Sequence, residues 1–269
     1  MHSISSRQNP FVQRCRDLAR GREAGGGDIL LDGLHLLSDA LAAGVPIAAA
    51  AATTHVWRSQ EGASLLRRLE AAGTELFEAT ATVIEAAAPV RTSSGLVAIG
   101  RWQTAGTDAI FSSSPALVVC VVHVQDPGNV GAIVRAAEAA GATGVVVAAG
   151  SADPLGWKAL RGSMGSVFRL PIAAGVDAAD VCASARDQGV DVLATSPADG
   201  LDLYECDLTG PVLVLVGGEG AGLPAEVGAL AHAAVRIPMR APVESLNVAV
   251  ATGIILFEAQ RQRRAVTSR

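Results

Sequence analysis

Residues 236–258 read RIPMRAPVESLNVAVATGIILFE, and this stretch decides how the rest of the chain is interpreted. An apolar strand end is followed by a proline-containing turn, and the polar segment 244–247 then leads into a long apolar helix. Ser245 and Asn247 at a helix start can satisfy free backbone N–H groups, and helix N-termini also collect polar ligands. The stretch therefore predicts either a capped helix or a ligand-binding turn.

Two earlier stretches have the same arrangement. Residues 126–135 read DPGNVGAIVR and follow the apolar run 117–124, while residues 217–223 read GGEGAGL and follow the run 212–216. Each places glycine-rich backbone and one or two polar side chains after an expected strand. Because ligands bind outside the carboxyl ends of the strands in open α/β sheets, the three stretches predict a site at one edge of a sheet.

The second half of the chain alternates between strands and helices. Strands that are apolar at nearly every position, separated by amphipathic helices, predict a parallel sheet covered on both faces. The expected strands are 117–124, 144–149, 168–172, 190–194, 212–216 and 234–237, and the expected helices are 131–140, 155–160, 178–188, a short one after Pro224, and 246–261.

The first hundred residues predict a smaller α/β domain with its own sheet. The expected helices are 9–22, opened by Asn9 with Pro10 at the first helical position and broken by Gly25–Gly27, then 34–43, 64–72 and 82–88; the expected strands are 29–31, 47–52, 75–77 and 96–99. Residues 101–115 lose this periodicity and gather Gly, Ser and Thr, which is typical of a linker. The predicted organisation is a domain at 1–100, a linker at 101–115 and a domain at 116–269.

Composition excludes several classes of protein. A chain of 269 residues with 50% hydrophobic residues can bury a large core. It has no uninterrupted apolar window long enough to span a membrane and no apolar signal core at its start, so we expect neither a membrane span nor export, and a cytoplasmic location. The four cysteines and five histidines lack ligand spacing, so we expect reduced, packed cysteines and no metal; the cysteines are Cys15, Cys120, Cys182 and Cys206.

Positive charge gathers at the two ends of the chain although the net charge is −5. Residues 1–23 carry five arginines, including Arg7, Arg14 and Arg16, against two acids, and residues 259–269 carry four arginines and no acid. Arginine suits bidentate phosphate contacts, but high-GC codon usage would give the same bias, so charge alone leaves phosphate binding open. Aromatic residues make up 3% of the chain, which argues against recognition by rows of stacked bases.

The polar residues of these loops allow two interpretations each. Asn129 and Arg135 either face one crevice, with Asn129 in a loop and Arg135 in the next helix, or act as a helix cap and a surface ion-pairing residue. Glu219 either serves a ligand that approaches the glycine backbone closely, or is a solvated turn residue. The segment is not a Walker loop, and it lacks the G-x-G-x-x-G fingerprint of dinucleotide sites.

The order of the motifs is more specific than any one of them. N-x-G-x-x-x-R after a strand, then G-G-E-G-x-G-L, then I-P-M followed by S-L-N-V strongly resembles the SpoU/TrmH family of S-adenosylmethionine-dependent RNA 2′-O-ribose methyltransferases in the SPOUT superfamily. Residues 161–171 are similar to that family's R-A-S-x-G-x-x-F-x-x-P stretch, with Gly162 in place of Ala. Asn9-Pro10, Leu31–Gly33 and Thr92–Ala98 resemble the L30e-like RNA-binding domain that many members carry, so the resemblance spans nearly the whole chain.

The resemblance implies a fold and a set of functional residues. The fold is a SPOUT domain with a deep trefoil knot, an exception to the rule against knotted chains. S-adenosylmethionine would bind in the knot, largely through main chain, and the site would act on the ribose 2′-hydroxyl. By motif match the donor-binding residues are Gly217, Ile237 and Leu246, with Met239 as a neighbouring wall and Thr195 as a further contact, and the catalytic residues are Arg135, Asn129, Glu219, Ser245 and Asn247.

The family associates Arg135 with activation of the 2′-hydroxyl, but a guanidinium with a pKa above about 12 is a poor base. We therefore expect Arg135 to bind the adjacent phosphate and to stabilise developing alkoxide charge, whichever group takes the proton. Glu244 places a negative charge beside the expected site and has no evident role.

The resemblance also implies partners. Family members are homodimers, and we expect the final helix to form the contact; an N-terminal arginine cluster including Arg7, Arg14 and Arg16 would hold structured RNA. Ribosomal RNA, and 23S RNA in particular, is favoured over transfer RNA because the extra domain accompanies many ribosomal members. The alternatives are a tRNA methyltransferase, an antibiotic-resistance rRNA methyltransferase, and a non-catalytic RNA-binding module of ribosome assembly; a nucleotide- or flavin-binding protein has no fingerprint in its favour.

Overall fold

The structure is a computed structural model that describes residues 2–21, 26–88 and 94–267. The chain divides into two compact units, the first made of residues 1–103 and 155–168 and the second of residues 104–154 and 169–269. Residues 155–168 thus make their contacts with the first unit, although they lie within the predicted second domain; the domain limits stay a prediction. Parts of four stretches given above lie outside the described residues: 22–23 in the N-terminal charge cluster, Gly25 in the glycine run, Thr92 and its neighbour 93, and 268–269 at the end of the chain.

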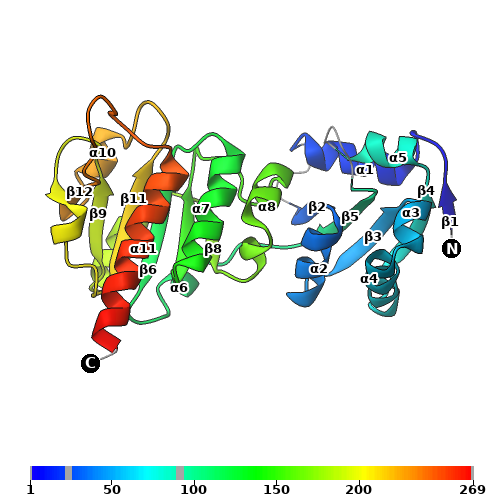
Figure 1. The fold of residues 1–269 in the computed structure, drawn as a ribbon, viewed down its shortest axis with the longest axis horizontal. Helices are drawn as coiled ribbons and strands as arrows, with labels where there is room; N and C mark the ends of the chain where they lie inside the picture. Colours follow the sequence, from blue (N-terminus) through cyan, green and yellow to red (C-terminus); the bar gives the residue numbers. More distant parts are fainter. Residues whose placement is uncertain (1, 22–25, 89–93, 268–269) are drawn as a thin grey trace. The chain divides into compact units, whose positions relative to one another are not determined.

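The first unit contains a five-stranded mixed sheet (Figure 1). The pairs β1–β4 and β4–β3 are parallel, while β5 runs antiparallel to both β3 and β2. In spatial order the strands are β1 (His2–Ile4), β4 (Glu75–Ala79), β3 (Ile47–Ala52), β5 (Leu96–Arg101) and β2 (Asp28–Asp32).

The helices of the first unit cover this sheet. The Asn9 side chain accepts the backbone N–H of Phe11, which starts the first helix at Pro10 as predicted. That helix packs against α5 over a core that includes Phe11, Val12 and Ile84. The helices are α1 (Pro10–Ala19), α2 (Leu34–Ala42), α3 (Thr54–Arg58), α4 (Gln60–Ala71), α5 (Ala81–Ala87), α8 (Trp157–Ser163) and the 3-10 helix η1 (Ser166–Phe168). Whether the unit is L30e-like stays a prediction.

The second unit contains a seven-stranded sheet in which every recorded strand pair is parallel. The prediction of a parallel sheet is confirmed. In spatial order the strands are β10 (Leu201–Asp202), β12 (Ala233–Arg236), β9 (Asp191–Thr195), β11 (Val212–Gly217), β6 (Leu117–Val122), β7 (Gly144–Ala148) and β8 (Ile172–Val176).

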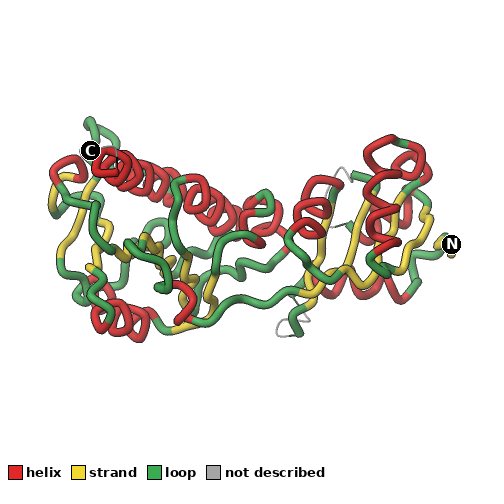
Figure 2. The backbone as a smooth tube through the Cα atoms, turned by 90° about the horizontal axis from the view of Figure 1, so that it is seen from below, coloured by secondary structure: helices red, strands yellow, loops and turns green. Residues whose placement is uncertain are grey.

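Helices cover both faces of this sheet (Figure 2). The long helix α11 packs against α7 on one face. On the other face α6 and α9 enclose a core with alternate strand residues such as Val118, Cys120 and Leu213. The helices are α6 (Thr107–Ile110), α7 (Pro127–Ala139), α9 (Ala178–Asp187), the 3-10 helix η2 (Leu203–Glu205), α10 (Ala225–Gly228) and α11 (Val248–Thr267).

Several predicted elements need correction. The expected strand 168–172 is wrong: Ser166–Phe168 form a 3-10 helix, and the strand β8 begins only at Ile172. Helix α7 starts four residues earlier than expected because the Asp126 side chain accepts the N–H groups of Gly128 and Asn129. The short elements β1, α3, α6 and β10 were not predicted, because two to five residues carry no readable periodicity.

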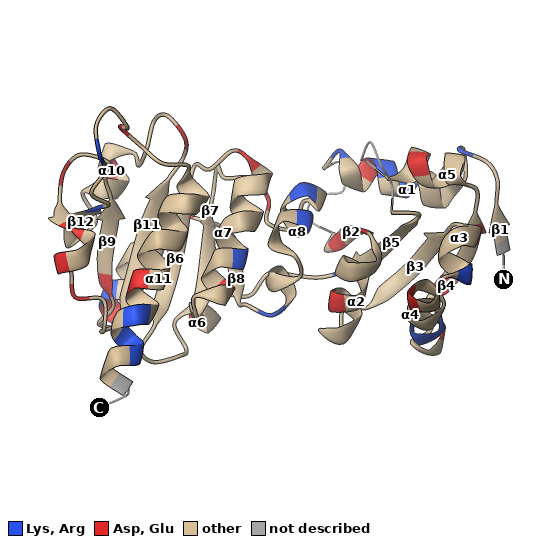
Figure 3. Ribbon diagram, in the orientation of Figure 1, with Lys and Arg blue, Asp and Glu red and all other residues tan. Residues whose placement is uncertain are grey.

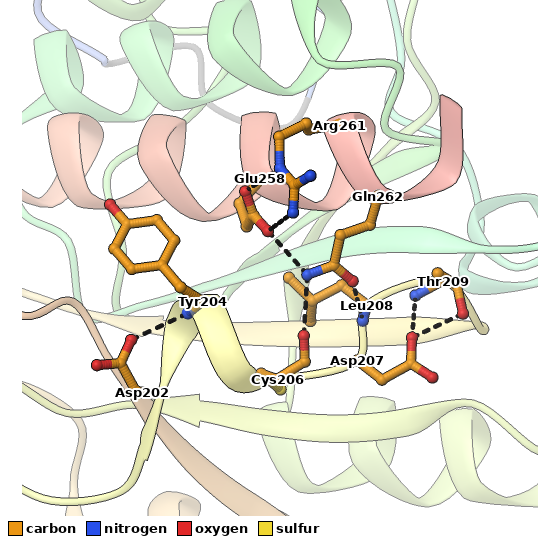
Figure 4. A network of polar contacts seen from close by, with 9 residues as sticks. All are labelled: Asp202, Tyr204, Cys206, Asp207, Leu208, Thr209, Glu258, Arg261 and Gln262. Carbon is orange, nitrogen blue, oxygen red and sulfur yellow. Dashed lines mark hydrogen bonds and ion pairs between the residues drawn. The ribbon is translucent and has the colours of Figure 1, made fainter. Parts of the chain in front are cut away.

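The C-terminal end of α11 is anchored to the loop before β11. Gln262 accepts the N–H of Leu208 and donates to the carbonyl of Cys206 and to Glu258, and Arg261 binds Glu258 through two nitrogens (Figure 4). The Arg263 guanidinium donates to backbone carbonyls at residues 115, 116, 208 and 210. Arg261 and Arg263, counted above as free positive charge at the end of the chain, are therefore engaged within the protein.

Two further expectations concern the whole chain. All four cysteines are buried and unpaired, and burial raises the pKa of the Cys15 thiol to about 12. Among the described helices none combines the length and apolarity that crossing a bilayer requires. The trefoil knot stays a prediction.

Candidate functional site

A line of three side chains joins the three motifs at the carboxyl edge of the seven-stranded sheet. The Asn129 amide nitrogen donates to a Glu219 carboxylate oxygen, and the Asn247 amide nitrogen donates to Asn129 Oδ1 over 3.1 Å. These residues lie 90 and 118 positions apart in the chain. The prediction that the bends carrying them converge on one place is confirmed for these three residues.

Asn247 has a second contact that fixes the direction of this line. Its Oδ1 accepts the backbone N–H groups of Ala249 and Val250 over 3.0 and 3.3 Å, so Asn247 caps α11. Because the oxygen faces the helix, the amide nitrogen faces Asn129 and must donate. Asn247 therefore caps α11 and reaches Asn129 at once, and its catalytic role stays a prediction.

Asn129 is held differently from what the sequence suggested. It lies in the first turn of α7 rather than in a loop. The helix is capped by Asp126, and not by Asn129 as one of the two interpretations expected. Its side chain is therefore not needed for capping and is available to Glu219 and Asn247. The Asp-Pro pair at residues 126 and 127, cap followed by first helical position, was the signal that could have placed the helix start correctly.

Helices α7 and α11 run parallel, side by side (Figure 1). Their N-terminal ends meet at Asn129 and Asn247, while near the other end Gln260 donates to the carbonyl of Ala139 over 3.3 Å. Between these points a Cβ on Gly253 would lie 3.9 Å from the Ala136 Cβ. Small residues at this crossing let the helices approach closely, which brings the two asparagines within hydrogen-bonding distance.

Two predicted catalytic residues stand outside this line. Arg135 is exposed on α7, six residues after Asn129, and at 3.6 residues per turn their side chains leave the helix about 120° apart. Within the described part of the chain the Arg135 side chain has no recorded hydrogen bond or ion pair. Ser245 is exposed in the segment before α11. The catalytic roles of both residues stay predictions.

The first two glycines of residues 217–222 are explained by the protein's own backbone. A Cβ on Gly217 would lie 2.2 Å from the carbonyl carbon of Gly222, and a Cβ on Gly218 would lie 2.2 Å from the carbonyl oxygen of His123. The loop therefore folds back on itself and against the end of β6, and this packing holds Glu219 beside α7. Close approach of a ligand was the expected reason for these glycines, and the structure supplies a different one.

The predicted donor-binding residues lie at the ends of adjacent strands. Thr195 ends β9, Gly217 ends β11, and Ile237 directly follows β12; β9 pairs with both of the other strands. The Thr195 hydroxyl donates to the Leu215 carbonyl over 3.0 Å, so it ties β9 to β11. Ile237 and Met239 are half-buried, and Leu246 is 36% exposed. The chain thus offers apolar side chains at this edge.

Unpaired main chain lies between these side chains. Within the described chain no backbone hydrogen bond is recorded for residues 237–239 or for residues 244–246. Pro238 and residues 244–246 are exposed, so water can pair their backbone groups, and Pro238 has no N–H. The backbone groups of Ile237 and Met239 lie beside half-buried apolar side chains, which suits a ligand with an apolar ring and several polar atoms, such as a nucleoside.

The N-terminal arginines have partners inside the first unit. Arg14 pairs with Asp28, and Arg16 donates through Nε to the Ala86 carbonyl over 2.9 Å. Arg7 is exposed in the turn before α1. Lys and Arg also lie on α8 and along the C-terminal part of α11 (Figure 3). RNA binding by Arg7, Arg14 and Arg16 stays a prediction.

One residue at this edge, which its place at the end of an apolar run predicted to be structural, has an unusual backbone conformation. His123, directly after β6, has a backbone φ of 53°, which is uncommon for a residue other than glycine. Its imidazole packs where a Cβ on Gly150 would lie, and its carbonyl contacts Gly218. No signal in the sequence reports backbone conformation at a histidine, so this feature could not have been found there. In the described residues no group of His, Cys, Asp and Glu is arranged to hold a metal ion.

Comparison with known proteins decides the family. The model of the SpoU rRNA Methylase family matches residues 116–257. An uncharacterised tRNA/rRNA methyltransferase of Synechocystis is 36% identical over 99% of this chain and 96% of its own length. The chain belongs to the SpoU rRNA methylase family.

Two further relatives of this SpoU family chain are informative. The 23S rRNA (guanosine-2′-O-)-methyltransferase of Pseudomonas syringae is 36% identical over 61% of this chain and 66% of its own length. The crystal structure of an AdoMet-bound rRNA methyltransferase from Sinorhizobium meliloti has a TM-score of 0.86 and 33% sequence identity, covering 96% of this chain and 97% of that one. The SPOUT fold class predicted from the motifs is confirmed.

Proposed function

We propose that this chain transfers a methyl group from S-adenosylmethionine to a ribose 2′-hydroxyl of structured RNA, in 23S ribosomal RNA. The hydrogen-bonded line Glu219–Asn129–Asn247 carries the proposal, because it assembles polar residues of three distant motifs beside a half-apolar edge with free main chain. The Pseudomonas relative is a guanosine-2′-O-methyltransferase of 23S rRNA, and the Sinorhizobium structure contains AdoMet, which supports the donor and the acceptor class.

The donor would be held by the strand-end residues. Ile237, Met239 and Leu246 supply apolar contact, and the unpaired main chain of residues 237–239 supplies hydrogen bonds. When bound, S-adenosylmethionine supplies an electrophilic methyl group on a positively charged sulfur. Thr195 ties the end of β9 to β11, and Gly217 pairs with Val122 at the end of β6, which shapes the floor of the site.

The polar residues would position the acceptor. Asn129 directs one Glu219 oxygen, which leaves the other carboxylate oxygen able to accept a hydrogen bond from a ribose hydroxyl. Arg135 binds the adjacent phosphate and stabilises the alkoxide that develops as the 2′-oxygen loses its proton. Ser245, in the exposed segment before α11, completes the polar wall. Orientation of the 2′-oxygen behind the methyl carbon supplies much of the rate.

The surface of α11 supports a homodimer. Val250 and Phe257 are 52% and 48% exposed, and their spacing of seven residues places them on one face of the helix. An exposed apolar stripe of this kind is typical of an association surface. In a dimer, Arg135 of the partner subunit or of the same chain completes the site.

RNA would be held by the first unit, through Arg7 and the basic residues on α1 and α8 (Figure 3). Because phosphate contacts release counterions, the affinity for RNA should fall steeply as salt is raised. A filter-binding titration at increasing potassium chloride checks this. A flat salt response would contradict binding through the phosphate backbone.

The decisive experiment maps the product. Full-length protein is incubated with labelled donor and total RNA, and alkali-resistant linkages are then mapped to single nucleotides. Label at one position of 23S rRNA supports the proposal; label in transfer RNA would move the assignment to the tRNA enzymes. Absence of label together with absence of donor binding by calorimetry would favour a non-catalytic RNA-binding module.

A further inference from the structure

The first unit contains a cavity lined by none of the residues proposed above to bind the donor or to act in methyl transfer. Its volume is about 490 Å³, within the range of roughly 300–1,000 Å³ that is usual for small-molecule sites. It lies where β2 ends, beside the start of α2 and the end of α8. Its polar and exposed side chains are Asp32, His35, Asp39, Ser94, Arg161 and Met164.

Asp32 is the unusual member of this lining. Its side chain is only 6% exposed, yet it has a single hydrogen bond among the described residues, from the Ser94 hydroxyl to Oδ1 over 3.2 Å. Arg161 Nη1 lies 3.6 Å from Oδ2, which is longer than a hydrogen bond. Burial is the largest influence on this carboxyl group and raises the pKa of Asp32, against the opposing effects of Ser94 and Arg161.

A carboxylate can accept about four hydrogen bonds, so Asp32 keeps unused acceptor positions in a place that water reaches poorly. Burying such a group with its acceptor positions only partly filled, by Ser94 and a long ion pair with Arg161, costs free energy, which a ligand that donates hydrogen bonds would recover. An anion is excluded as the group that meets Asp32, since two carboxylates, Asp32 and Asp39, line the cavity against the single guanidinium of Arg161. The ligand must therefore present N–H or O–H donors.

Among the RNA bases only guanine carries two adjacent donors, N1–H and the 2-amino group, which match the two oxygens of one carboxylate. Met164 is 43% exposed and sits in the left-handed conformation with φ 49° at the end of α8, so its apolar side chain is available to the face of a base. Arg161, 47% exposed, can reach a phosphate while it stays near Asp32.

We propose that this cavity binds an unpaired guanine of the RNA substrate, with Asp32 accepting hydrogen bonds from N1–H and the 2-amino group. This proposal rests on the proposed function. It assigns to the cavity a guanine of the same RNA substrate, distinct from the nucleotide that is methylated. It makes Asp32 a specificity-determining residue and Arg161 a phosphate contact.

The test measures binding of mononucleotides to the full-length protein by NMR or calorimetry. Guanosine monophosphate should bind more tightly than inosine, adenosine, cytidine and uridine monophosphates; inosine lacks only the 2-amino group. Asp32→Asn replaces one hydrogen-bond acceptor by a donor, so it should lower the affinity for guanosine monophosphate by at least about tenfold. It should also favour xanthosine monophosphate, whose 2-oxo group accepts where guanine donates. If Asp32 were only structural, Asp32→Asn would not change the preferred base from guanine to xanthine.

The control is Glu61→Gln, which removes the same charge from an exposed position in the first turn of α4 of the same unit and should leave the base preference unchanged. A short single-stranded RNA with one guanine should compete with guanosine monophosphate, and failure to compete would overturn the RNA origin of the base. Equal binding of guanosine and inosine monophosphates by the unmodified protein would overturn the proposal even if Asp32→Asn does not fold. Donor binding is measured separately, so failure here is distinguishable from failure of the methyltransferase assignment.

Discussion

Asn247 makes one amide serve the fold and the site together. Its oxygen caps α11 and its nitrogen holds Asn129, which in turn directs Glu219. The motifs in the sequence were sufficient to bring these three residues together. They could not place the Arg135 side chain. The helix was expected to start four residues later than it does, and the direction of Arg135 relative to Asn129 depends on both residues lying on the same helix. Nor could they reveal that Gly217 and Gly218 accommodate the chain's own backbone.

Replacing Asn129 by Asp tests the line directly. The variant keeps the size of the side chain but turns the donor toward Glu219 into a second carboxylate, so the two groups repel each other. Methyl transfer should fall by about 100-fold, the usual effect of losing one positioned donor in an active site, while donor affinity is kept. Single-turnover kinetics with labelled donor measure the rate.

The matched control is Gln188→Glu, which adds the same charge at an exposed position after α9 in the same unit. It should retain the normal rate. Near-normal transfer by Asn129→Asp would mean that Glu219 needs no orientation by this amide.

Arg135→Lys separates charge from shape. A lysine keeps the positive charge but cannot make the planar, bidentate contact that a guanidinium makes with phosphate. We expect kcat to fall by about 100-fold with a smaller change in RNA affinity, measured by steady-state kinetics and filter binding. Nearly full turnover would rule out a bidentate role, and the exposed Arg67→Lys on α4 serves as the control for the substitution itself.

At the level of elements, long periodic segments were predictable and short or capped ones were not. The apolar runs of β6 and β11 and the helix α9 were placed within two residues, while α11 was recognised but runs six residues beyond its expected end. The strand expected at 168–172 failed because Phe168 is buried in a 3-10 helix, where an apolar run looks the same as in a strand. The anchoring of α11 could not be predicted from the sequence, because Gln262 and Arg263 donate to backbone carbonyls that are far away in the chain.

The anchor of α11 predicts a pH dependence. Hydrogen bonds from Arg261, followed by Gln262, hold the pKa of the buried Glu258 below its ordinary value of 4.5. A depressed carboxyl pKa contributes stability that is complete above the ordinary value and is lost as the pH falls through the lower, folded value. Glu258→Gln should therefore lower the unfolding free energy by about 1 kcal/mol at pH 7, and this difference should shrink below pH 4.5.

Urea unfolding of both proteins at pH 7 and pH 3 measures the two differences. Glu226→Gln, at an exposed position of α10, is the control and should have little effect at either pH. A Glu258→Gln deficit that stays constant across this range would show that packing, and not the ion pair, accounts for the loss.

On the scale of the whole molecule, the exposed stripe on α11 predicts association. Phe257→Asp places a charge in the middle of an apolar face, so the protein should elute as a monomer where the unmodified chain elutes as a dimer. Light scattering after size-exclusion chromatography gives the mass. Leu201→Asp, 54% exposed on β10, is the control and should remain dimeric. A monomeric unmodified protein that still methylates RNA would exclude a shared site.

The double use of Asn247 has a practical consequence. The backbone hydrogens of Ala249 and Val250 are bonded to the amide that also reaches Asn129, so fraying of the first turn of α11 and disassembly of the site are one event. Their rates of deuterium uptake therefore report, residue by residue and before any substrate is added, what fraction of molecules has lost the link between Asn247 and Asn129.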